Sequence, residues 1–475
     1  MAVSTRSVCI VGAGPSGLVA AKTFLQHGGY AVTVFEAADR VGGMWRAQPD
    51  EYGDKCSPEM RTNLSRFTVA FSDLSWSSVD LSDPVAGAAS RTTPPMFPKA
   101  WEVGRYLEKY TEKFGLKSSI FLNHKVVNAD ILDDFITWQI TTCDMVTHQE
   151  TTQTFDYLVI ASGFFDKPGR TYKPSPEDHC INIQHSSRFR NLDSLTPDAG
   201  KIVVIGGGIS GSEAAAQAAF QISTAKHSPG KSKPAHAESK VYHIVNRPFY
   251  CLPRYLPQKP YEASSQATNL APTFLPLDLI LYNLSRRGEG EIAASITTVP
   301  PEKAKKGHEF MRSVIGSDQQ EYGNAALVYR EEQMQYPGYS GITDTYAEFV
   351  RSGVIIPVQG WVERVKHKDN SDSFDVALRH NAPWASVETQ VSRVFVLGDT
   401  MLTNASPKAR FLMLMASSKL LATESTSSTF TIPPKASYTL IHLALAFRSF
   451  WLAVPCSPIS QLSALSASTK DHTGE

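Results

Sequence analysis

Three glycines near the start of the chain have the spacing of a loop that holds a pyrophosphate. The run GAGPSG places Gly12, Gly14 and Gly17 after an apolar, β-branched segment at 7–12. Gly12 permits the tight turn, Gly14 lets the backbone approach the pyrophosphate, and Gly17 allows a helix to pack closely on a strand. Glu36 ends the next apolar segment, where a carboxylate can accept hydrogen bonds from ribose hydroxyl groups. These residues predict a site for a dinucleotide with an unphosphorylated ribose.

A second glycine loop of the same type occurs near the middle of the chain. The run GGGISG contains Gly206, Gly208 and Gly211. The apolar segment that follows it ends in Asn246 and Arg247, without a carboxylate. An acidic residue there would repel a 2′-phosphate, whereas Arg247 can pair with one, so this loop predicts NADPH. Two dinucleotide sites indicate two cofactors, FAD and NADPH, with hydride passing from the nicotinamide to the flavin.

The elements that must position these loops form a pattern that occurs twice. The periodicity predicts two βαβ units, with strands at 7–12, 31–36, 201–206 and 241–246 and helices at 18–26 and 212–221. Alternating strands and a terminal apolar strand follow each unit, at 124–140 and 155–163 and again at 353–379 and 392–398. The repetition predicts an α/β fold with two Rossmann-like dinucleotide-binding domains, the NADPH domain being inserted within the FAD domain.

The domain boundaries follow from the same pattern. Residues 1–195 are predicted to form the first part of the FAD-binding domain, and 196–350 the NADPH-binding domain. A polar segment at 222–240, which contains proline and glycine, reads as a surface loop of the second domain. Residues 351–475 are predicted to return to the FAD domain, with an atypical, glycine-poor C-terminal tail from residue 399.

Composition excludes several classes of protein. The 475 residues include 46 Lys plus Arg and 46 Asp plus Glu, and a balanced chain lacks the electrostatic footprint of a nucleic-acid binder. No two of the six cysteines have CxxC spacing, which argues against a dithiol disulfide reductase and against a cysteine-based metal site. The N-terminal apolar stretch runs into the glycine loop and does not resemble a secretory signal. We therefore expect a cytoplasmic protein without a metal.

Several segments resemble the flavin-containing monooxygenase family of class B flavoprotein monooxygenases, especially its fungal members. The similar segments are DRVGGMW (39–45), MRTNLSRFTVAFSD (60–73), FPKAWEVGRYLEKYTEKFG (97–115), ASGF (161–164), GGGISG (206–211) and YSGITDTYAEFVRSGVIIPVQ (339–359). The resemblance implies that an FAD C4a-hydroperoxide transfers one oxygen atom from O2 to a small organic substrate. This would be an N-, S- or C-oxygenation, in fungal secondary metabolism.

The resemblance also implies which residues lie beside the cofactors. It assigns Asn63 to the catalytic site, near the flavin. A neutral hydrogen-bonding amide suits a reactive oxygen intermediate, which decays where water and stray protons reach it. The other residues it places at the cofactors, beyond those of the two loops and strand ends, are Pro15, Ser16, Gly43, Met44, Trp45, Thr62, Ala161, Gly163 and Ser210.

Two alternatives stay open. A Baeyer–Villiger monooxygenase acting on a ketone carries FxGxxxHxxxW, and His185 matches its histidine. However, the flanking positions of that motif carry other residues here. An inactive FAD- and NADPH-binding relic is the second alternative, because no glycine occurs between Gly398 and Gly474 in the tail that should close the FAD site.

The sequence leaves the substrate and the oligomeric state open. The apolar run at 438–455 would be short for a membrane span, and it contains His442 and Arg448. We therefore expect this run to pack against the protein, with membrane association as the alternative.

Overall fold

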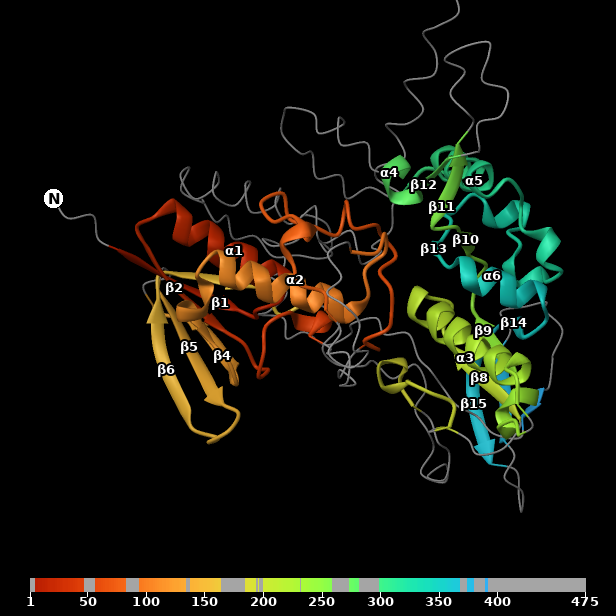
Figure 1. The fold of residues 1–475 in the computed structure, drawn as a ribbon, viewed down its shortest axis with the longest axis horizontal. Helices are drawn as coiled ribbons and strands as arrows, with labels where there is room; N and C mark the ends of the chain where they lie inside the picture. The colour runs from red at the N-terminus through yellow and green to blue at the C-terminus, as the bar shows by residue number, and fades with distance from the viewer. Residues whose placement is uncertain are drawn as a thin grey trace, which may run out of the picture. The chain divides into compact units, whose positions relative to one another are not determined.

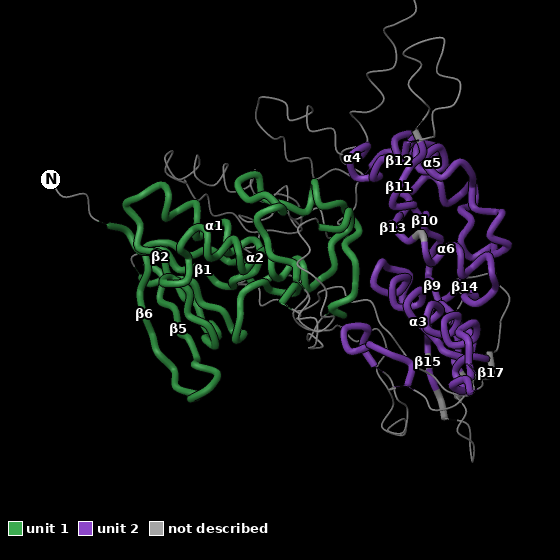
Figure 2. Tube along the Cα trace, in the orientation of Figure 1, with its two compact units in different colours: residues 1–167, 283–296, 402–454 green, residues 168–282, 297–401, 455–475 purple. Residues whose placement is uncertain are grey.

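The structure is a computed structural model, and its described residues form two compact units. These residues are 5–46, 56–82, 94–133, 137–163, 184–193, 195, 200–230, 232–258, 273–281, 299–367, 374–379 and 389–391. Those up to residue 163 belong to the first unit, and those from residue 184 onward belong to the second (Figure 2).

The first unit is built on a parallel four-stranded sheet. Its strands are β1 (Arg6–Val11), β2 (Tyr30–Phe35), β3 (Ile120–Phe121) and β7 (Tyr157–Ile160), in the order β3-β2-β1-β7. Helix α1 (Pro15–His27) connects β1 to β2 and packs against both of them (Figure 1). This is the predicted βαβ unit, and it places the first glycine loop at the carboxyl end of β1.

Long-range hydrogen bonds join the first strand to the end of the unit. The backbone N–H of Ser7 donates to Asp156 Oδ2 over 2.7 Å, and the Ser7 hydroxyl donates to the same oxygen over 2.8 Å. These hydrogen bonds hold the pKa of Asp156 below its usual value. They lie beside the β1–β7 pairing, in which Val8 is opposite Tyr157.

Two further parts complete the first unit. Strands β4 (His124–Ile131), β5 (Trp138–Asp144) and β6 (Glu150–Phe155) form an antiparallel sheet. Helix α2 (Ala100–Lys113) packs against α1, and it buries one face with Tyr106 and Tyr110.

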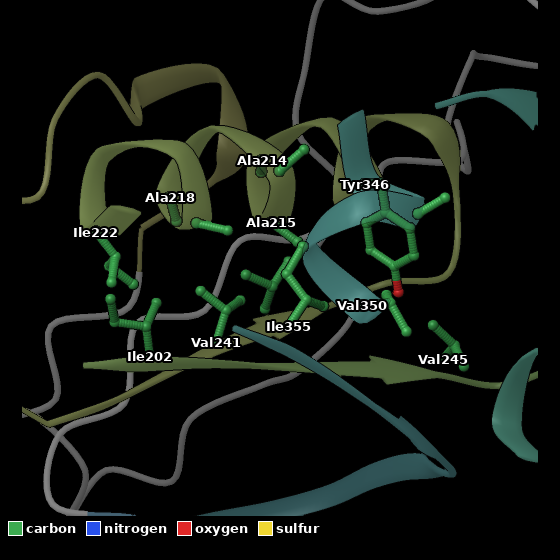
Figure 3. Close-up of a cluster of buried hydrophobic side chains, with 14 of the residues drawn as sticks. Ile202, Ala214, Ala215, Ala218, Ile222, Val241, Val245, Tyr346, Val350 and Ile355 are labelled. Carbon is green, nitrogen blue, oxygen red and sulfur yellow. The ribbon is translucent and has the colours of Figure 1, made fainter. Parts of the chain in front are cut away.

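The second unit repeats the arrangement of the first. Strands β8 (Lys201–Ile205), β9 (Lys240–Val245) and β14 (Ile355–Gln359) form a parallel sheet in the order β14-β9-β8. Helix α3 (Ile209–His227) covers it, and its alanines pack on strand residues such as Val241 (Figure 3). An antiparallel sheet again follows, made of β15 (Trp361–His367), β16 (Phe374–Arg379) and β17 (Thr389–Val391).

This pairing corrects one predicted boundary. The sequence pattern predicts that the chain returns to the FAD domain at residue 351, but β14 pairs in parallel with β9, with Ile355 opposite Val241. Ile355 is also buried in the same core cluster as residues of α3. The apolar pattern of 355–359 correctly indicated a strand, but it did not specify the sheet to which that strand belongs. The second unit therefore extends to residue 391 at least.

The predicted polar loop at 222–240 is partly wrong. Helix α3 continues through Ile222, which is buried, to His227. Ser228 is the C-cap of this helix, immediately before a proline and a glycine. Within the rest of the predicted loop, residues 235–238 form a short 3-10 helix.

The chain between β9 and β14 forms a smaller layer of the second unit. It contains β10 (Tyr250–Leu252), β11 (Tyr255–Gln258), β12 (Thr273–Pro276), α4 (Leu277–Leu281), α5 (Pro301–Ile315), β13 (Ser340–Ile342) and α6 (Asp344–Arg351). The 3-10 helices of the two units are η1 (Gly43–Trp45), η2 (Trp76–Ser78), η3 (Leu116–Ser119), η4 (Ser186–Arg188), η5 (Ala235–Glu238), η7 (Gln320–Tyr322), η8 (Ala325–Leu327) and η9 (Glu331–Gln333).

Two of the sequence-based expectations concern residues outside the described ranges. They are the glycine-poor tail from residue 399 and, within it, the apolar run at 438–455. Among the described residues, no helix is both long and apolar enough to cross a membrane. The same residues contain no cluster of three or more His, Cys, Asp or Glu side chains that could hold a metal ion.

Candidate dinucleotide-binding sites

The first glycine loop has a backbone that only glycine fits at its first position. Gly12 has a φ of +100°, and a Cβ atom there would lie 2.6 Å from the carbonyl oxygen of Ala161. The N–H of Gly12 donates to the carbonyl of Phe35 over 2.7 Å, and the N–H of Ala161 donates to Val11 over 2.8 Å. The structure therefore brings Ala161 against the loop, and its predicted place at the cofactor stays a prediction.

The other two glycines of this loop make close backbone contacts. A Cβ atom on Gly17 would lie 1.8 Å from the carbonyl oxygen of Gly12, so the helix can approach the strand only at a glycine. The turn at Gly42 and Gly43 packs on the same loop. The N–H of Gly42 donates to the carbonyl of Ala13 over 3.0 Å, and a Cβ atom on Gly43 would lie 3.2 Å from the Cα of Gly14.

The N-terminus of α1 presents backbone donors at this point. Gly14 is the N-cap, and Pro15 occupies the first helical position and has no N–H. The first intrahelical hydrogen bond runs from the N–H of Leu18 to the carbonyl of Gly14 over 3.0 Å. The N–H groups of Ser16 and Gly17 lie ahead of this bond, at the positive end of the helix dipole, which is where an anion binds.

Glu36 holds the first loop in shape. Its side chain is buried, being 8% exposed. Oε2 accepts the N–H of Ala13 over 2.7 Å, and Oε1 accepts the N–H of Ala38 over 2.9 Å. An ionised carboxylate has about four lone-pair sites, so these two bonds leave capacity for ribose hydroxyl groups.

The remaining predicted residues of the first unit lie in its packed loops. Trp45 is buried in η1, and the carbonyl of Met44 accepts a hydrogen bond from the Cys56 thiol over 2.9 Å. Thr62 is buried, and its hydroxyl donates to the carbonyl of Leu64 over 2.7 Å. This hydrogen bond stabilises the local bend of the chain. Asn63 is half-buried beside Thr62. The cofactor roles of these side chains stay predictions.

The last predicted residue of this unit follows β7. Gly163 has a φ of +77° and lies two positions after Ala161. This conformation favours glycine, so the backbone alone explains why a glycine occurs after this strand.

The second glycine loop has the same geometry as the first. Gly206 has a φ of +126°, and its N–H donates to the carbonyl of Ile244 over 3.0 Å. A Cβ atom on Gly211 would lie 1.9 Å from the carbonyl oxygen of Gly206. Gly208 is the N-cap of α3, and its carbonyl accepts the N–H of Ser212 over 3.0 Å. Ser210, an exposed residue, lies in the first turn of this helix.

The strand end beside the second loop differs in chemistry from the first. Val245, which is buried, follows the carbonyl that accepts the loop N–H, so it occupies the place that Glu36 has in the first unit. The next residues, Asn246 and Arg247, are exposed. The guanidinium of Arg247 lies 5.0 Å from the centre of the Tyr339 ring. The structure thus leaves Arg247 accessible at the strand end where the sequence predicts it.

Sequence reasoning missed a histidine beneath this loop. His243 Nε2 lies 2.7 Å from the carbonyl oxygen of Gly206, and Nδ1 lies 2.8 Å from the Tyr346 hydroxyl. The ring is fully buried, and burial lowers its pKa to about 4, although the bond to Gly206 acts in the opposite direction. The imidazole is therefore neutral near pH 7, donating from Nε2 and accepting at Nδ1. A polar residue within the apolar run VYHIVN was the available signal.

A family comparison identifies this arrangement. Residues 6–258, more than half of the chain, match the model described as pyridine nucleotide-disulphide oxidoreductase. The chain belongs to the pyridine nucleotide-disulphide oxidoreductase family. The chain has two Rossmann-like units in a mixed α/β fold, as predicted. Its cysteines nevertheless lack the CxxC spacing of a dithiol reductase.

Two curated relatives are named as a flavin-containing monooxygenase and an N-oxygenase. The chain is 29% identical over 257 residues to flavin-containing monooxygenase FMO GS-OX-like 6 of Arabidopsis thaliana, covering 50% of this chain and 52% of the relative. It is 28% identical over 253 residues to senecionine N-oxygenase of Tyria jacobaeae, covering 52% and 50%. The chain thus spans about half the length of the curated relatives it matches. The resemblance to flavin-containing monooxygenases drawn from the motifs is confirmed, and its fungal part stays a prediction.

A solved structure of a steroid monooxygenase bound to NADP is also similar. It shares 16% sequence identity with the chain at a TM-score of 0.47, covering 83% of this chain and 71% of that chain.

Proposed function

We propose that the protein is an NADPH-dependent flavin monooxygenase, which inserts one oxygen atom from O2 into a small organic substrate. One observation carries the proposal: two glycine loops of the same geometry adjoin strand ends of different chemistry, Glu36 in one unit and Arg247 in the other. Two dinucleotides of different ribose chemistry are the ligands that suit such a pair. The relatives named as monooxygenases and N-oxygenases support this assignment.

The first site fits FAD. The N–H groups at the start of α1 and the backbone of Gly14 would hold the pyrophosphate, and Glu36 would accept the ribose hydroxyl groups. The turn at Gly43 packs on Gly14, with a Cβ atom on Gly43 lying 3.2 Å from the Cα of Gly14, and neither glycine places a side chain there. A bound pyrophosphate therefore meets backbone here and not side chains.

The second site fits NADPH. The first turn of α3 would hold the pyrophosphate, and Arg247 would pair with the 2′-phosphate. Val245 makes no charge repulsion with that phosphate, as a carboxylate in its place would.

The chain's own contribution to the chemistry is position and surroundings. When bound, FAD supplies the redox chemistry that takes hydride from NADPH and activates O2. Asn63 is proposed to be the catalytic residue, offering a neutral amide that donates and accepts hydrogen bonds without delivering a proton. The substrate is proposed to present an amine nitrogen, a sulfide sulfur or an oxidisable carbon.

The first test is the visible absorption spectrum of the freshly purified full chain. Near-stoichiometric flavin, followed by NADPH oxidation that speeds up with candidate amines or sulfides and yields products one oxygen heavier, is expected. A ketone converted to an ester would instead support the Baeyer–Villiger alternative. A colourless protein that refuses added FAD would overturn the proposal, in favour of the non-catalytic alternative suggested by the glycine-free stretch between Gly398 and Gly474.

A paired variant locates the catalytic residue. Asn63→Ala is expected to keep flavin but to lose product while NADPH oxidation continues, because reduced flavin would then be consumed without oxygen transfer. The matched control is Asn128→Ala, which changes an exposed asparagine of β4. Unchanged product yield in Asn63→Ala would remove Asn63 from the catalytic role.

A further inference from the structure

Tyr339 lies between the two parts of the second dinucleotide site. Its hydroxyl accepts the N–H of Ile209, the first residue of α3, over 3.3 Å. Its ring lies under the guanidinium of Arg247, 5.0 Å from its centre. One side chain thus contacts the helix that would hold the pyrophosphate and the arginine that would hold the 2′-phosphate.

The backbone of Tyr339 is itself held on both sides. Its N–H donates to the Tyr329 hydroxyl over 2.8 Å, and its carbonyl accepts the N–H of Tyr250 over 2.8 Å. Two positions later Gly341 packs on the Ile209 side chain, where a Cβ atom would come within 3.0 Å. The ring is half-buried against the core of the unit. Tyr339 is therefore a fixed surface, whereas Arg247 is an exposed, flexible side chain.

A guanidinium within about 6 Å of a tyrosine ring centre is attracted to its face. The attraction narrows the directions in which the Arg247 side chain can point, and less conformational entropy is lost when a phosphate binds. The hydroxyl of Tyr339 acts on a different part of the ligand. It takes up the N–H of the first helical residue, which leaves the later N–H groups of the turn to the pyrophosphate.

We infer that Tyr339 is a specificity-determining positioning residue, whose ring holds Arg247 ready for the 2′-phosphate of NADPH and whose hydroxyl shapes the start of α3. The inference rests on the proposed NADPH site. It assigns discrimination between NADPH and NADH to the ring, and an effect common to both coenzymes to the hydroxyl.

The test measures binding of two coenzyme fragments to the full chain by calorimetry. The fragments are 2′,5′-ADP, which carries the 2′-phosphate, and 5′-AMP, which does not. The wild-type chain is expected to prefer 2′,5′-ADP by about 10- to 100-fold, as charge-assisted hydrogen bonds imply. Arg247→Ala should remove most of that preference. Tyr339→Leu should lower it by about 2- to 5-fold, and Tyr339→Phe should keep it.

Two further variants test whether Tyr339 acts through Arg247 or whether its replacement disturbs the site in general. In the Arg247→Ala background, Tyr339→Leu should not lower the preference further. Tyr336→Leu, which changes an exposed tyrosine three positions earlier, should leave it unchanged.

The outcomes for the two proposals are distinct. A wild-type chain without preference, or an Arg247→Ala variant that keeps it, would overturn the NADPH site and the inference with it. Loss of preference in Arg247→Ala but not in Tyr339→Leu would overturn the inference alone. If Tyr339→Leu does not fold, the Phe variant decides, because a loss of preference there would contradict the role given to the ring.

Discussion

The glycine loops of the two units have the same geometry, but the side chains that hold them form different hydrogen bonds. One side chain accepts from the loop backbone, and the other donates to it. In the first unit Glu36 accepts the N–H of Ala13, a backbone donor of the loop. In the second unit His243 donates to the carbonyl of Gly206, a backbone acceptor. The fold requires only that the loop be held, and either partner suffices. In the second unit His243 holds the loop, so the strand end at Val245 and Arg247 can differ, whereas in the first unit Glu36 both holds the loop and is proposed to accept the ribose hydroxyl groups.

The first helical position shows a parallel difference. In α1 it is occupied by Pro15, which has no N–H to satisfy. In α3 it is Ile209, whose N–H is taken by the Tyr339 hydroxyl. The N–H of the first helical position is thus absent in one helix and bonded in the other.

The largest effect on stability and on binding is expected where the close contact between helix and glycine loop, which both units share, is disrupted. Gly17→Ala and Gly211→Ala each place a Cβ atom within 2 Å of a backbone carbonyl oxygen, and each should destabilise its own unit by about 4 kcal/mol or more. Gly17→Ala should abolish flavin binding, and Gly211→Ala should abolish 2′,5′-ADP binding. Flavin absorbance and calorimetry on both variants measure this. Gly307→Ala, which changes a half-buried glycine inside α5, is the control for replacing a helical glycine.

The second-largest effect is expected from replacing Glu36, the carboxylate that holds the first loop. Glu36→Val gives the first unit the residue found at this place in the second, and it leaves the N–H groups of Ala13 and Ala38 without their acceptor. We expect a loss of about 3 kcal/mol in stability together with loss of FAD, measured by thermal unfolding and flavin content. Binding of 2′,5′-ADP should persist. Retention of flavin by this variant would show that the loop does not depend on Glu36.

His243, which holds the second loop, predicts that the stability of the protein depends on pH. Because burial lowers the pKa of His243 to about 4, its stabilising contribution is complete above about pH 6.5 and is lost as the pH falls toward 4. His243→Val should cost about 2 kcal/mol near pH 7, and its stability should fall less steeply with acid than that of the wild type. Thermal unfolding between pH 4 and 7.5 measures both effects.

A second substitution tests whether His243 acts with Tyr346. The Tyr346 hydroxyl is its hydrogen-bond partner, so Tyr346→Phe should cost less in the His243→Val background than in the wild type. Equal costs in the two backgrounds would show that the two side chains act independently.

The smallest effect concerns the different lengths of the two helices. Helix α3 runs to His227, and near its end Lys226 pairs with Glu238 over 3.2 Å. Both side chains are largely exposed, so Lys226→Ala should change stability by no more than about 0.5 kcal/mol. A larger change in unfolding midpoint would mean that the extra turns of α3 depend on this pair.

Local patterns predicted the parts of the fold that short spacing determines. The glycine loops, the helices that follow them and the strand ends at Glu36 and Arg247 could all be read from neighbouring residues. What depends on distant partners could not. Tyr346, one partner of His243, is 103 positions away from it, and Tyr339, the partner of the Ile209 N–H, is 130 positions away. The return predicted at residue 351 failed for the same reason, because an apolar strand does not reveal its neighbour in the sheet.

The hydrogen bonds between Ser7 and Asp156 bear on the order in which the strands of the first unit can pair during synthesis. The two residues are 149 positions apart, and they lie beside the pairing of β1 with β7. At about 5–20 residues per second, a ribosome needs roughly 7–30 s to make the intervening chain. During that interval β1 can pair with β2, but its other edge has no strand to meet. The first unit therefore closes late in its own synthesis, and its earliest strand is the one that waits longest for its second neighbour.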